Sequence, residues 1–271
     1  MKQDIARYVN HCKICQQVKY DQQRPSGFMG SYRGVAKPFE MISTDVLGPL
    51  PRSSAGHKYL FVVMCTFTKF PLLFPLREIT ASTIAKQLED DVFMLFEVPS
   101  YIICDNGSEI RGKQVQELSR SYNIKLLYNA RRHAQANPIE RVNKTLGPML
   151  RAYIGENHRH WDRNIAKYGF ALRSAKHEAT SYSPAYLNFG RELIAINEDA
   201  DPTNSSEEAS QVEESSAYGD RWKELKNIYK DVNGKLREAH EKQAERYNLR
   251  RREVVFKEGS LIGSKEKLSH I

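Results

Sequence analysis

The chain has 271 residues, enough for one or two domains with a core of normal size. Its hydrophobic content of 40% argues against a disordered chain, and no apolar run approaches the roughly 20 residues that span a bilayer. The net charge of +8 and the pI of about 9.2 are compatible with a polyanionic partner such as nucleic acid, although many globular proteins are mildly basic. The first residues also lack the apolar segment of a secretory signal peptide. We therefore expect no membrane partner and a reducing, intracellular setting.

The N-terminal segment carries a cysteine pair. Residues 1–19 are predicted to be helical, and Cys12 and Cys15 stand in the CxxC spacing. In a reducing compartment such a pair binds metal or does redox work more often than it forms a structural disulfide. Residues 21–38 are rich in glycine, proline and polar residues, which predicts a linker between this segment of residues 1–20 and the next domain.

Three strand-like runs follow the linker. They cover residues 39–46, 58–67 and 70–76, and the second is rich in β-branched and aromatic residues, as buried strands are. Pro71 and Pro75 suit an edge position in the third run, because proline cannot donate to a sheet ladder. Tight connections between the three runs predict antiparallel pairing.

The hydrophobic period then changes to that of helices. Further helices are expected at 80–96, 113–122, from about Pro138, at 161–174 and at 184–189, and short strands at 101–104 and 124–128. Strands that alternate with helices can pair parallel. The order of elements predicts an α/β domain over residues 39–195, with a five-stranded mixed sheet flanked by helices, which is the strand order of the RNase H-like fold.

The composition changes again after the predicted α/β domain. Residues 196–217 carry seven acidic residues and no basic one, which is typical of a solvated, disordered linker. A helix is predicted over 218–252, because Leu225, Tyr229, Val232 and Leu236 recur at spacings of three and four.

Three carboxylates stand where the predicted fold would gather them. Asp45 lies near the end of the first strand, Asp105 directly follows the strand at 101–104, and Glu140 falls in the first turn of the next helix. The carboxyl ends of strands and adjoining helix starts are where open α/β sheets build their sites. Carboxylate oxygens suit a pair of divalent metals that promotes phosphoryl transfer. Glu140 could equally complete a capping box with Asn137.

The residues around these carboxylates resemble a known family. The segments TDVLGPLP, CDNGSEI and HAQANPIERVNKTL surround them in this order, and Glu140 follows Asp105 by 35 positions. Together they resemble the integrase core of gypsy-like LTR retrotransposons and, more distantly, of retroviruses, with its D,D-35-E spacing. IARYVNHCKICQQVK resembles the second half of the family's zinc-binding module, and SYSPAYLNFGREL resembles the end of its core. The resemblance covers about residues 1–195, and more loosely 220–269.

The resemblance implies roles for individual residues. Asp45, Asp105 and Glu140 would hold Mg²⁺ or Mn²⁺ as the catalytic carboxylates. Residues expected to contact DNA are Ser108 near the target, Asn143 and Lys144 at the element's ends, and Arg131, Arg132 and Arg141 at phosphates. For the arginines, a solvated side chain on an exposed loop or helix remains the alternative.

The sequence also departs from the family. Cys12 and Cys15 would bind Zn²⁺ only if two missing ligands were supplied, since structural zinc sites have four. Pro148 is expected to bend or break the helix that begins near Glu140. Glu109 adds a fourth carboxylate, which we expect to point away from the other three. Residues 253–271 resemble the start of an SH3-like module that then stops, as in a fragment of a longer polyprotein.

The resemblance implies a metal-dependent polynucleotidyl transferase that trims the 3′ ends of element DNA and joins them to target DNA. Its partners would be DNA and further copies of itself, and its location the nucleus. A retroelement-derived protein that binds DNA or a partner without joining DNA is the alternative. A true RNase H is disfavoured, because it would have a different carboxylate order.

Overall fold

The computed structural model describes residues 34–105, 107, 109–128, 139–154, 158–193, 216–249 and 251. The predicted zinc-binding segment, the acidic linker and the SH3-like start therefore fall largely or wholly outside the described residues. The chain divides into two units. The larger unit is Arg33–Ala239, and the other is Met1–Tyr32 with His240–Ile271.

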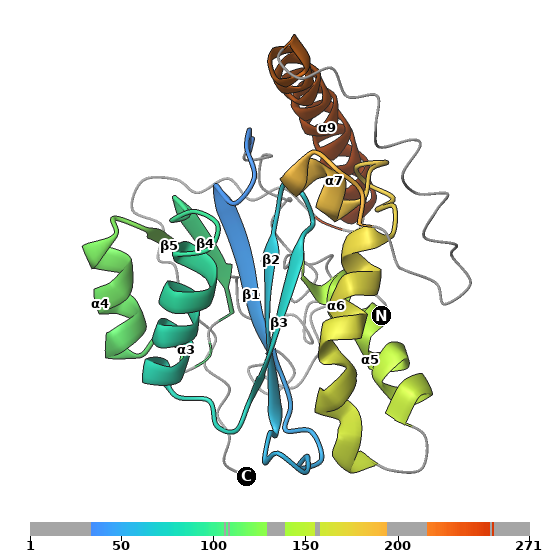
Figure 1. The fold of residues 1–271 in the computed structure, drawn as a ribbon. Coiled ribbons are helices and arrows are strands. Elements are labelled where there is room, and N and C mark those ends of the chain that lie inside the picture. The colour runs from blue at the N-terminus through green and yellow to red at the C-terminus, as the bar shows by residue number, and fades with distance from the viewer. Residues whose placement is uncertain are drawn as a thin grey trace, which may run out of the picture. The chain divides into compact units, whose positions relative to one another are not determined.

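The described part of the larger unit is built on one five-stranded mixed sheet (Figure 1). Its strands are β1 (Met41–Leu47), β2 (Tyr59–Cys65), β3 (Pro71–Leu76), β4 (Tyr101–Cys104) and β5 (Lys125–Tyr128), in the order β3-β2-β1-β4-β5. β1, β2 and β3 pair antiparallel, whereas β4 pairs parallel with β1 and with β5. The predicted sheet and its mixed pairing are confirmed.

The position of each strand follows from its residues. β2 is an interior, apolar strand, and from Leu60 to Cys65 its residues are at most 1% exposed. β3 lies at an edge, as Pro71 and Pro75 predicted. An edge strand leaves one row of backbone groups outside the ladder, so the missing N–H of proline is tolerated there.

Helices cover both faces of the sheet (Figure 1). The described elements are α3 (Ala81–Leu88), the π-helical turn η1 (Glu89–Phe93), α4 (Lys113–Ser121), α5 (Glu140–Ile154), the 3₁₀ helix η3 (His158–Asn164), α6 (Ile165–Ser174), α7 (Pro184–Phe189) and α9 (Ser216–Asn248). α3 and α4 contact each other on one side, and α5 and α6 lie on the other.

One face of β2 forms a core with α5, η3 and α6. Leu60, Val62 and Met64 alternate along the strand and so project to the same face. The helical residues that pack against them are Ile139, Val142, Leu146, Leu150, Trp161, Ile165 and Tyr168. This packing holds α5 over the face of the sheet that also carries Asp45, because Asp45 pairs directly with Val62.

Pro148 was expected to bend or break the helix, and it does not break it, since α5 runs through it to Ile154. An interior proline costs about 3 kcal/mol. The neighbouring Leu146 and Leu150 are 0% and 6% exposed, and burial of each contributes about 1.5–3 kcal/mol. The preceding Gly147 has no side chain to crowd the proline ring. Core packing therefore outweighs the loss of one backbone hydrogen bond.

The loop between β1 and β2 is fastened to η3. Asp162 Oδ2 accepts a hydrogen bond from Ser53 Oγ and lies 2.6 Å from His57 Nδ1. Burial raises the pKa of Asp162, but the bonds from Ser53 and His57 outweigh it and hold the pKa below its usual value. Trp161 Nε1 donates to the Pro51 carbonyl at 2.7 Å. The connection that follows the Asp45 strand is thus anchored at several points.

The predicted apolar stripe of α9 packs on the same unit. Tyr229 donates from its hydroxyl to the Leu187 carbonyl at 2.9 Å, and its ring meets Phe67 edge to face. Val232 is fully buried and Leu236 is 8% exposed. These contacts fix α9 through its apolar side, at least up to Ala239 where the unit ends.

No helix among the described residues is long and apolar enough to cross a membrane.

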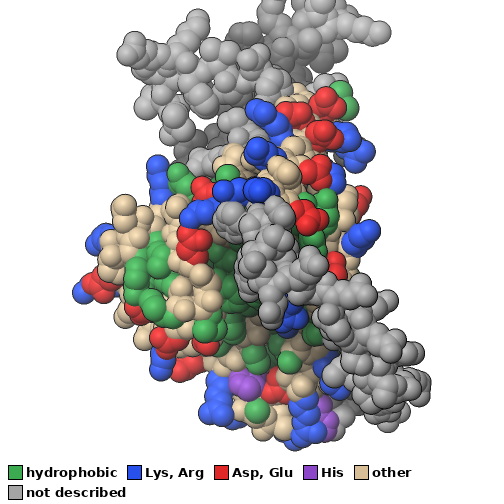
Figure 2. All heavy atoms as spheres, turned by 45° about the horizontal axis from the view of Figure 1, so that its top comes forward, with side chains coloured by type: hydrophobic (Ala, Val, Ile, Leu, Met, Phe, Trp, Pro, Cys, Tyr) green, Lys and Arg blue, Asp and Glu red, His purple; other side chains and the backbone are tan. Residues whose placement is uncertain are grey.

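Figure 2 shows hydrophobic side chains gathered on the left of that view, the side on which Figure 1 places α3, α4 and β5. β5 is an edge strand of the sheet, and Tyr128 at its end is exposed.

Candidate active site

Asp45 lies in β1, and Asp105 directly follows the neighbouring parallel strand β4. Met41 pairs with Tyr101 and Ser43 with Ile103, so the register is constant along β1 and β4. Continued by two residues, this register would bring Asp105 level with Asp45. Residues two apart on a strand project from the same face, and neighbouring strands lie about 4.8 Å apart. That the two carboxylates share one metal site stays a prediction.

Hydrogen bonds orient the carboxylate of Asp45. Its Oδ1 accepts from the Val46 backbone N–H at 2.9 Å, and its Oδ2 accepts from Asn143 Nδ2 at 2.6 Å. Asn143 lies on α5, so this bond ties the helix directly to the strand. The other amide atom, Asn143 Oδ1, is buried without a hydrogen-bond partner among the described groups.

Glu140 begins α5 one turn before Asn143. The Asn143 N–H donates to the Ile139 carbonyl at 3.0 Å, which establishes a helical turn here. Helix positions three apart share a face. The backbone thus places Glu140 on the face that meets Asp45, but its side chain lies outside the described residues. Within the described side chains, no three from His, Cys, Asp and Glu stand close enough to hold a metal ion.

The loop after Asp105 folds a further carboxylate toward it. Asp105 is exposed, and its Oδ1 accepts from the Gly107 N–H at 3.0 Å. A Cβ on Gly107 would lie 2.7 Å from Glu109 Oε1 and 3.1 Å from Asp105 Oδ1. Both carboxylates therefore flank the same glycine. The expectation that Glu109 points elsewhere is wrong, because the Arg111 N–H bonds to the Gly107 carbonyl and closes a tight turn.

Cys104 stands beside Asp105 but does not add a thiolate. Burial raises the pKa of its thiol to about 12, and the negative charge of Asp105 adds to this effect. Its Sγ faces the Leu127 carbonyl at 3.8 Å. The donors that the two strands offer at neutral pH are therefore carboxylate oxygens.

A basic group of three residues lies near the start of α5. Burial lowers the pKa of Lys69 to about 8, with the charge of Arg141 adding to it, and Lys69 Nζ donates to the Thr66 carbonyl at 2.6 Å. Burial likewise lowers the pKa of His177 to about 4, helped by the charges of Lys69 and Arg141. Sequence reasoning missed Lys69 and His177, because a lysine in a hairpin turn is normally solvated.

The lowered pKa of Lys69 predicts a pH-dependent gain in stability for Lys69→Met. As pH rises, the folded chain loses this proton first, so the cost of burying the charge is fully present below pH 8. This cost disappears as the pH rises from about 8, the pKa of Lys69 in the folded chain, to 10.5, its ordinary pKa. We expect Lys69→Met to raise the free energy of unfolding by about 1–2 kcal/mol at pH 7, after loss of the bond to Thr66, and by less near pH 10. Denaturant unfolding at both pH values measures this, with exposed Lys86→Met as control. A Lys69→Met variant that gains nothing at pH 7 contradicts the prediction.

The predicted DNA contacts divide into described and undescribed residues. Arg141 and Lys144 are exposed on α5, where they could meet a phosphate. Asn143 bonds to Asp45 in this structure. Ser108, Arg131 and Arg132 lie outside the described residues, as do Cys12 and Cys15.

A family model matches the part of the chain that holds the strands described above. Residues 35–134 match the family of integrase core domains. The predicted resemblance to integrases is confirmed. The matched residues include Asp45 and Asp105 and end before Glu140.

Two curated relatives extend the similarity beyond the core. The retrovirus-related Pol polyprotein from transposon 412 of Drosophila melanogaster is 24% identical over 234 residues, which are 86% of this chain and 19% of the polyprotein. The gypsy retrotransposon integrase-like protein 1 of Rattus norvegicus is 28% identical over 193 residues, 69% of this chain and 36% of that protein. The chain thus spans well under half the length of either relative.

A solved structure has the same fold. A chain of the simian T-cell lymphotropic virus intasome, determined in complex with the PP2A regulatory subunit B56 gamma, superposes with a TM-score of 0.54 at 19% identity. The match covers 74% of this chain and 71% of that one. With the strand order above, it confirms the predicted RNase H-like fold class.

Proposed function

We propose that the chain carries out DNA integration as a metal-dependent polynucleotidyl transferase, trimming 3′ ends of element DNA and joining them to target DNA. The observation that carries the proposal is the match of residues 35–134 to integrase core domains, with Asp45 in β1 and Asp105 directly after the parallel strand β4. The bond from Asn143 to Asp45 supports it further, since it brings the helix of Glu140 to the same site.

The site is suited to a hard divalent cation. Asp45, Asp105 and Glu140 would hold Mg²⁺ or Mn²⁺, which prefer carboxylate oxygens. The neighbouring Cys104 stays protonated and does not offer a soft ligand. When bound, a metal pair supplies activation of the attacking oxygen and stabilisation of the leaving oxygen. Zn²⁺ would bind at Cys12 and Cys15 only if another segment or subunit provided two ligands.

The chain's own residues would orient the metal ligands and bind the DNA. Asn143 and the Val46 N–H hold the Asp45 carboxylate in one orientation. Arg141 and Lys144 project from the same helix and would contact DNA phosphates next to the reacting strand. Ser108 would lie near target DNA, and Arg131 and Arg132 would approach the backbone of the element's end. A further copy of the chain and a nuclear location are part of the same proposal.

A DNA-joining assay tests the proposal, and it is designed for the case that the terminal DNA sequence recognised by the chain is unknown. Labelled duplexes with randomised terminal base pairs are incubated with supercoiled plasmid, the chain and either Mg²⁺ or Mn²⁺. Sequencing of plasmid junctions should find oligonucleotide 3′ ends joined to target strands, with enrichment of particular terminal sequences. Duplex binding without any junctions in either metal would favour the non-joining alternative.

DNA binding should depend steeply on salt and on Lys144. Each phosphate contact contributes about −0.9 to the slope of log affinity against log salt, through release of counterions. We expect Lys144→Ala to flatten this slope by about one unit, and Arg141→Ala to do the same. Fluorescence anisotropy in metal-free buffer measures both. Lys113→Ala, on α4 and paired with Glu117, serves as the control. Equal slopes for all variants would mean that these side chains only solubilise the surface.

A further inference from the structure

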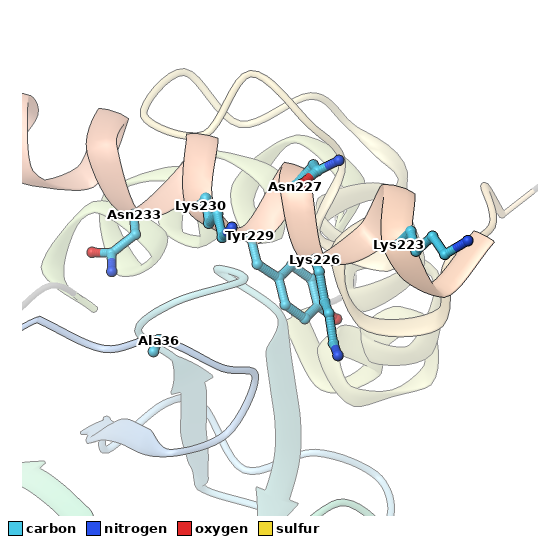
Figure 3. A pocket seen from close by; sticks show the side chains of 7 residues that line it. All are labelled: Ala36, Lys223, Lys226, Asn227, Tyr229, Lys230 and Asn233. Atoms are coloured by element: carbon cyan, nitrogen blue, oxygen red, sulfur yellow. The ribbon is translucent and has the colours of Figure 1, made fainter. Parts of the chain in front are cut away.

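Two aromatic side chains in the described part of the chain are strongly exposed. Tyr128 at the end of β5 is 39% exposed, and Phe189 at the end of α7 is 48% exposed. Other rings serve packing: Tyr229, for example, points from α9 toward the side on which Ala36 lies (Figure 3), and its hydroxyl donates to the Leu187 carbonyl. Single exposed rings are common on protein surfaces, so the surroundings of each ring decide what it can bind.

Tyr128 lies beside the candidate site. It pairs with Cys104, the last residue of β4, and Asp105 directly follows Cys104. Paired residues of neighbouring strands project to the same face, and successive residues of one strand project to opposite faces. The Tyr128 ring therefore flanks the end of the sheet that carries Asp105 without filling the site itself. β5 is an edge strand, so the sheet places no further strand on the outer side of the ring (Figure 1).

Arg111 connects this ring to the turn that follows Asp105. The guanidinium carbon of Arg111 lies 5.0 Å from the ring centroid of Tyr128, within the range of a cation–π contact. The Arg111 backbone N–H also donates to the Gly107 carbonyl and closes the turn. The ring is thereby held next to the segment that carries the proposed metal ligand.

The Tyr128 ring is uncharged at neutral pH. Partial burial raises the pKa of its phenol above the ordinary value, Cys104 adds to this effect, and the charge of Arg111 opposes it. A neutral ring does not repel phosphate, and the positive charge of Arg111 favours a polyanionic ligand over a cationic or purely apolar one. The chemistry beside Asp105 thus suits a flat, neutral group that is attached to a phosphate chain.

We propose that Tyr128 stacks on an unpaired base at the end of the DNA that the chain processes. This inference rests on the proposed function and adds a residue that recognises the state of the DNA end. Every base has a π face, so an exposed ring accepts any unpaired base, whereas a base inside an intact duplex is already stacked on its neighbours. Stacking next to Asp105 would hold the strand end beside the proposed metal ligands and keep the terminal pair open.

The test compares forked and blunt DNA. A labelled duplex with unpaired nucleotides at one end, and its fully paired counterpart, are bound to the chain in metal-free buffer, and anisotropy gives both affinities. Tyr128→Ala should weaken binding of the forked duplex by about tenfold, within the roughly 5- to 150-fold range of base–aromatic stacking, and leave the blunt duplex unchanged. Tyr128→Phe keeps the ring and should keep the affinity. Phe189→Ala, which removes the other exposed ring, should leave both affinities unchanged.

A fluorescent base reports the stacking directly. The fluorescence of 2-aminopurine is quenched when the base stacks on an aromatic ring, so it is placed at the unpaired position of the forked duplex. At saturating protein, the unchanged chain and Tyr128→Phe should quench it, and Tyr128→Ala should not. A ring that only supports the fold would leave the quenching of bound DNA unchanged in every variant. Thermal unfolding confirms that the variants fold.

The possible results separate this proposal from the proposed function. Equal losses for forked and blunt duplexes, or quenching that ignores Tyr128→Ala, would overturn the stacking of a base on Tyr128. Quenching that depends on Tyr128 in a chain that never joins DNA would contradict the proposed catalysis alone. Junctions formed by a chain whose binding of forked DNA ignores Tyr128 would contradict the stacking alone.

Discussion

Replacing Asp105 with asparagine is expected to reduce DNA joining by about 10³-fold, because bound metal contributes several kcal/mol to the transition state and each 1.36 kcal/mol is tenfold in rate. An amide keeps the size of the carboxylate but loses its charge, and divalent cations prefer charged oxygen ligands. The junction-sequencing assay measures the loss. Asp45→Asn should behave alike, because Asp45 is proposed to hold the same metal pair from β1.

Both variants should still bind duplex DNA in metal-free buffer, since the proposed phosphate contacts come from other residues. Asp90→Asn provides a matched control, because Asp90 is exposed on η1, away from α5 and β1. Joining that survives Asp105→Asn would remove Asp105 from the catalytic set. Loss of binding together with joining would indicate that the variant acts on the fold, which thermal unfolding would reveal.

Local sequence accounts for most of the element boundaries. β4 and α7 begin and end where they were predicted, at Tyr101–Cys104 and Pro184–Phe189. α7 shows why: Ser183 caps it by accepting from the Tyr186 N–H, Pro184 opens it, and Gly190 ends it with a φ of 68°. Caps and turns of this kind depend on neighbouring residues alone, so they can be recognised without tertiary contacts.

Elements whose geometry depends on distant contacts were predicted less well. The helix expected at 161–174 is a 3₁₀ segment, His158–Asn164, followed by α6. Contacts with the β1–β2 loop fall in that segment, and the partners are more than 100 residues apart in the chain. The helix expected at 80–96 similarly turns π-helical at Glu89–Phe93. Hydrophobic spacing detects a helix but does not distinguish these tighter or wider turns.

The candidate site was predicted through its motifs, and its supporting contacts were not. Asp45 and Asp105 were identified from the residues around them, and they lie in and directly after two strands that pair parallel. The bond from Asn143 to Asp45, the approach of Glu109 to Asp105 and the burial of Lys69 each depend on where a loop or helix packs. Single-sequence patterns carry no such distances.

Trp161→Ala is expected to lower the free energy of unfolding by about 3–5 kcal/mol, a large part of the stability of a domain of ordinary size. The indole is 1% exposed and belongs to the core cluster formed with β2 and α5. Truncation leaves a cavity there and also removes the bond from Nε1 to the Pro51 carbonyl. Urea unfolding measures the change, with exposed Met94→Ala as a control that should shift stability by less than about 0.5 kcal/mol.

A second variant separates the two contributions of this side chain. Trp161→Phe retains an aromatic ring in the cluster but removes the bond to the carbonyl of Pro51, an exposed residue, which costs about 0.5–1.5 kcal/mol with some loss of packing. We therefore expect the phenylalanine variant to lie between the unchanged chain and the alanine variant. Equal losses for both substitutions would mean that the hydrogen bond dominates; a loss for alanine no greater than that of Met94→Ala would mean that Trp161 does not anchor the loop. Because Trp161 is not one of the proposed metal ligands or DNA contacts, the folded fraction of either variant should still join DNA.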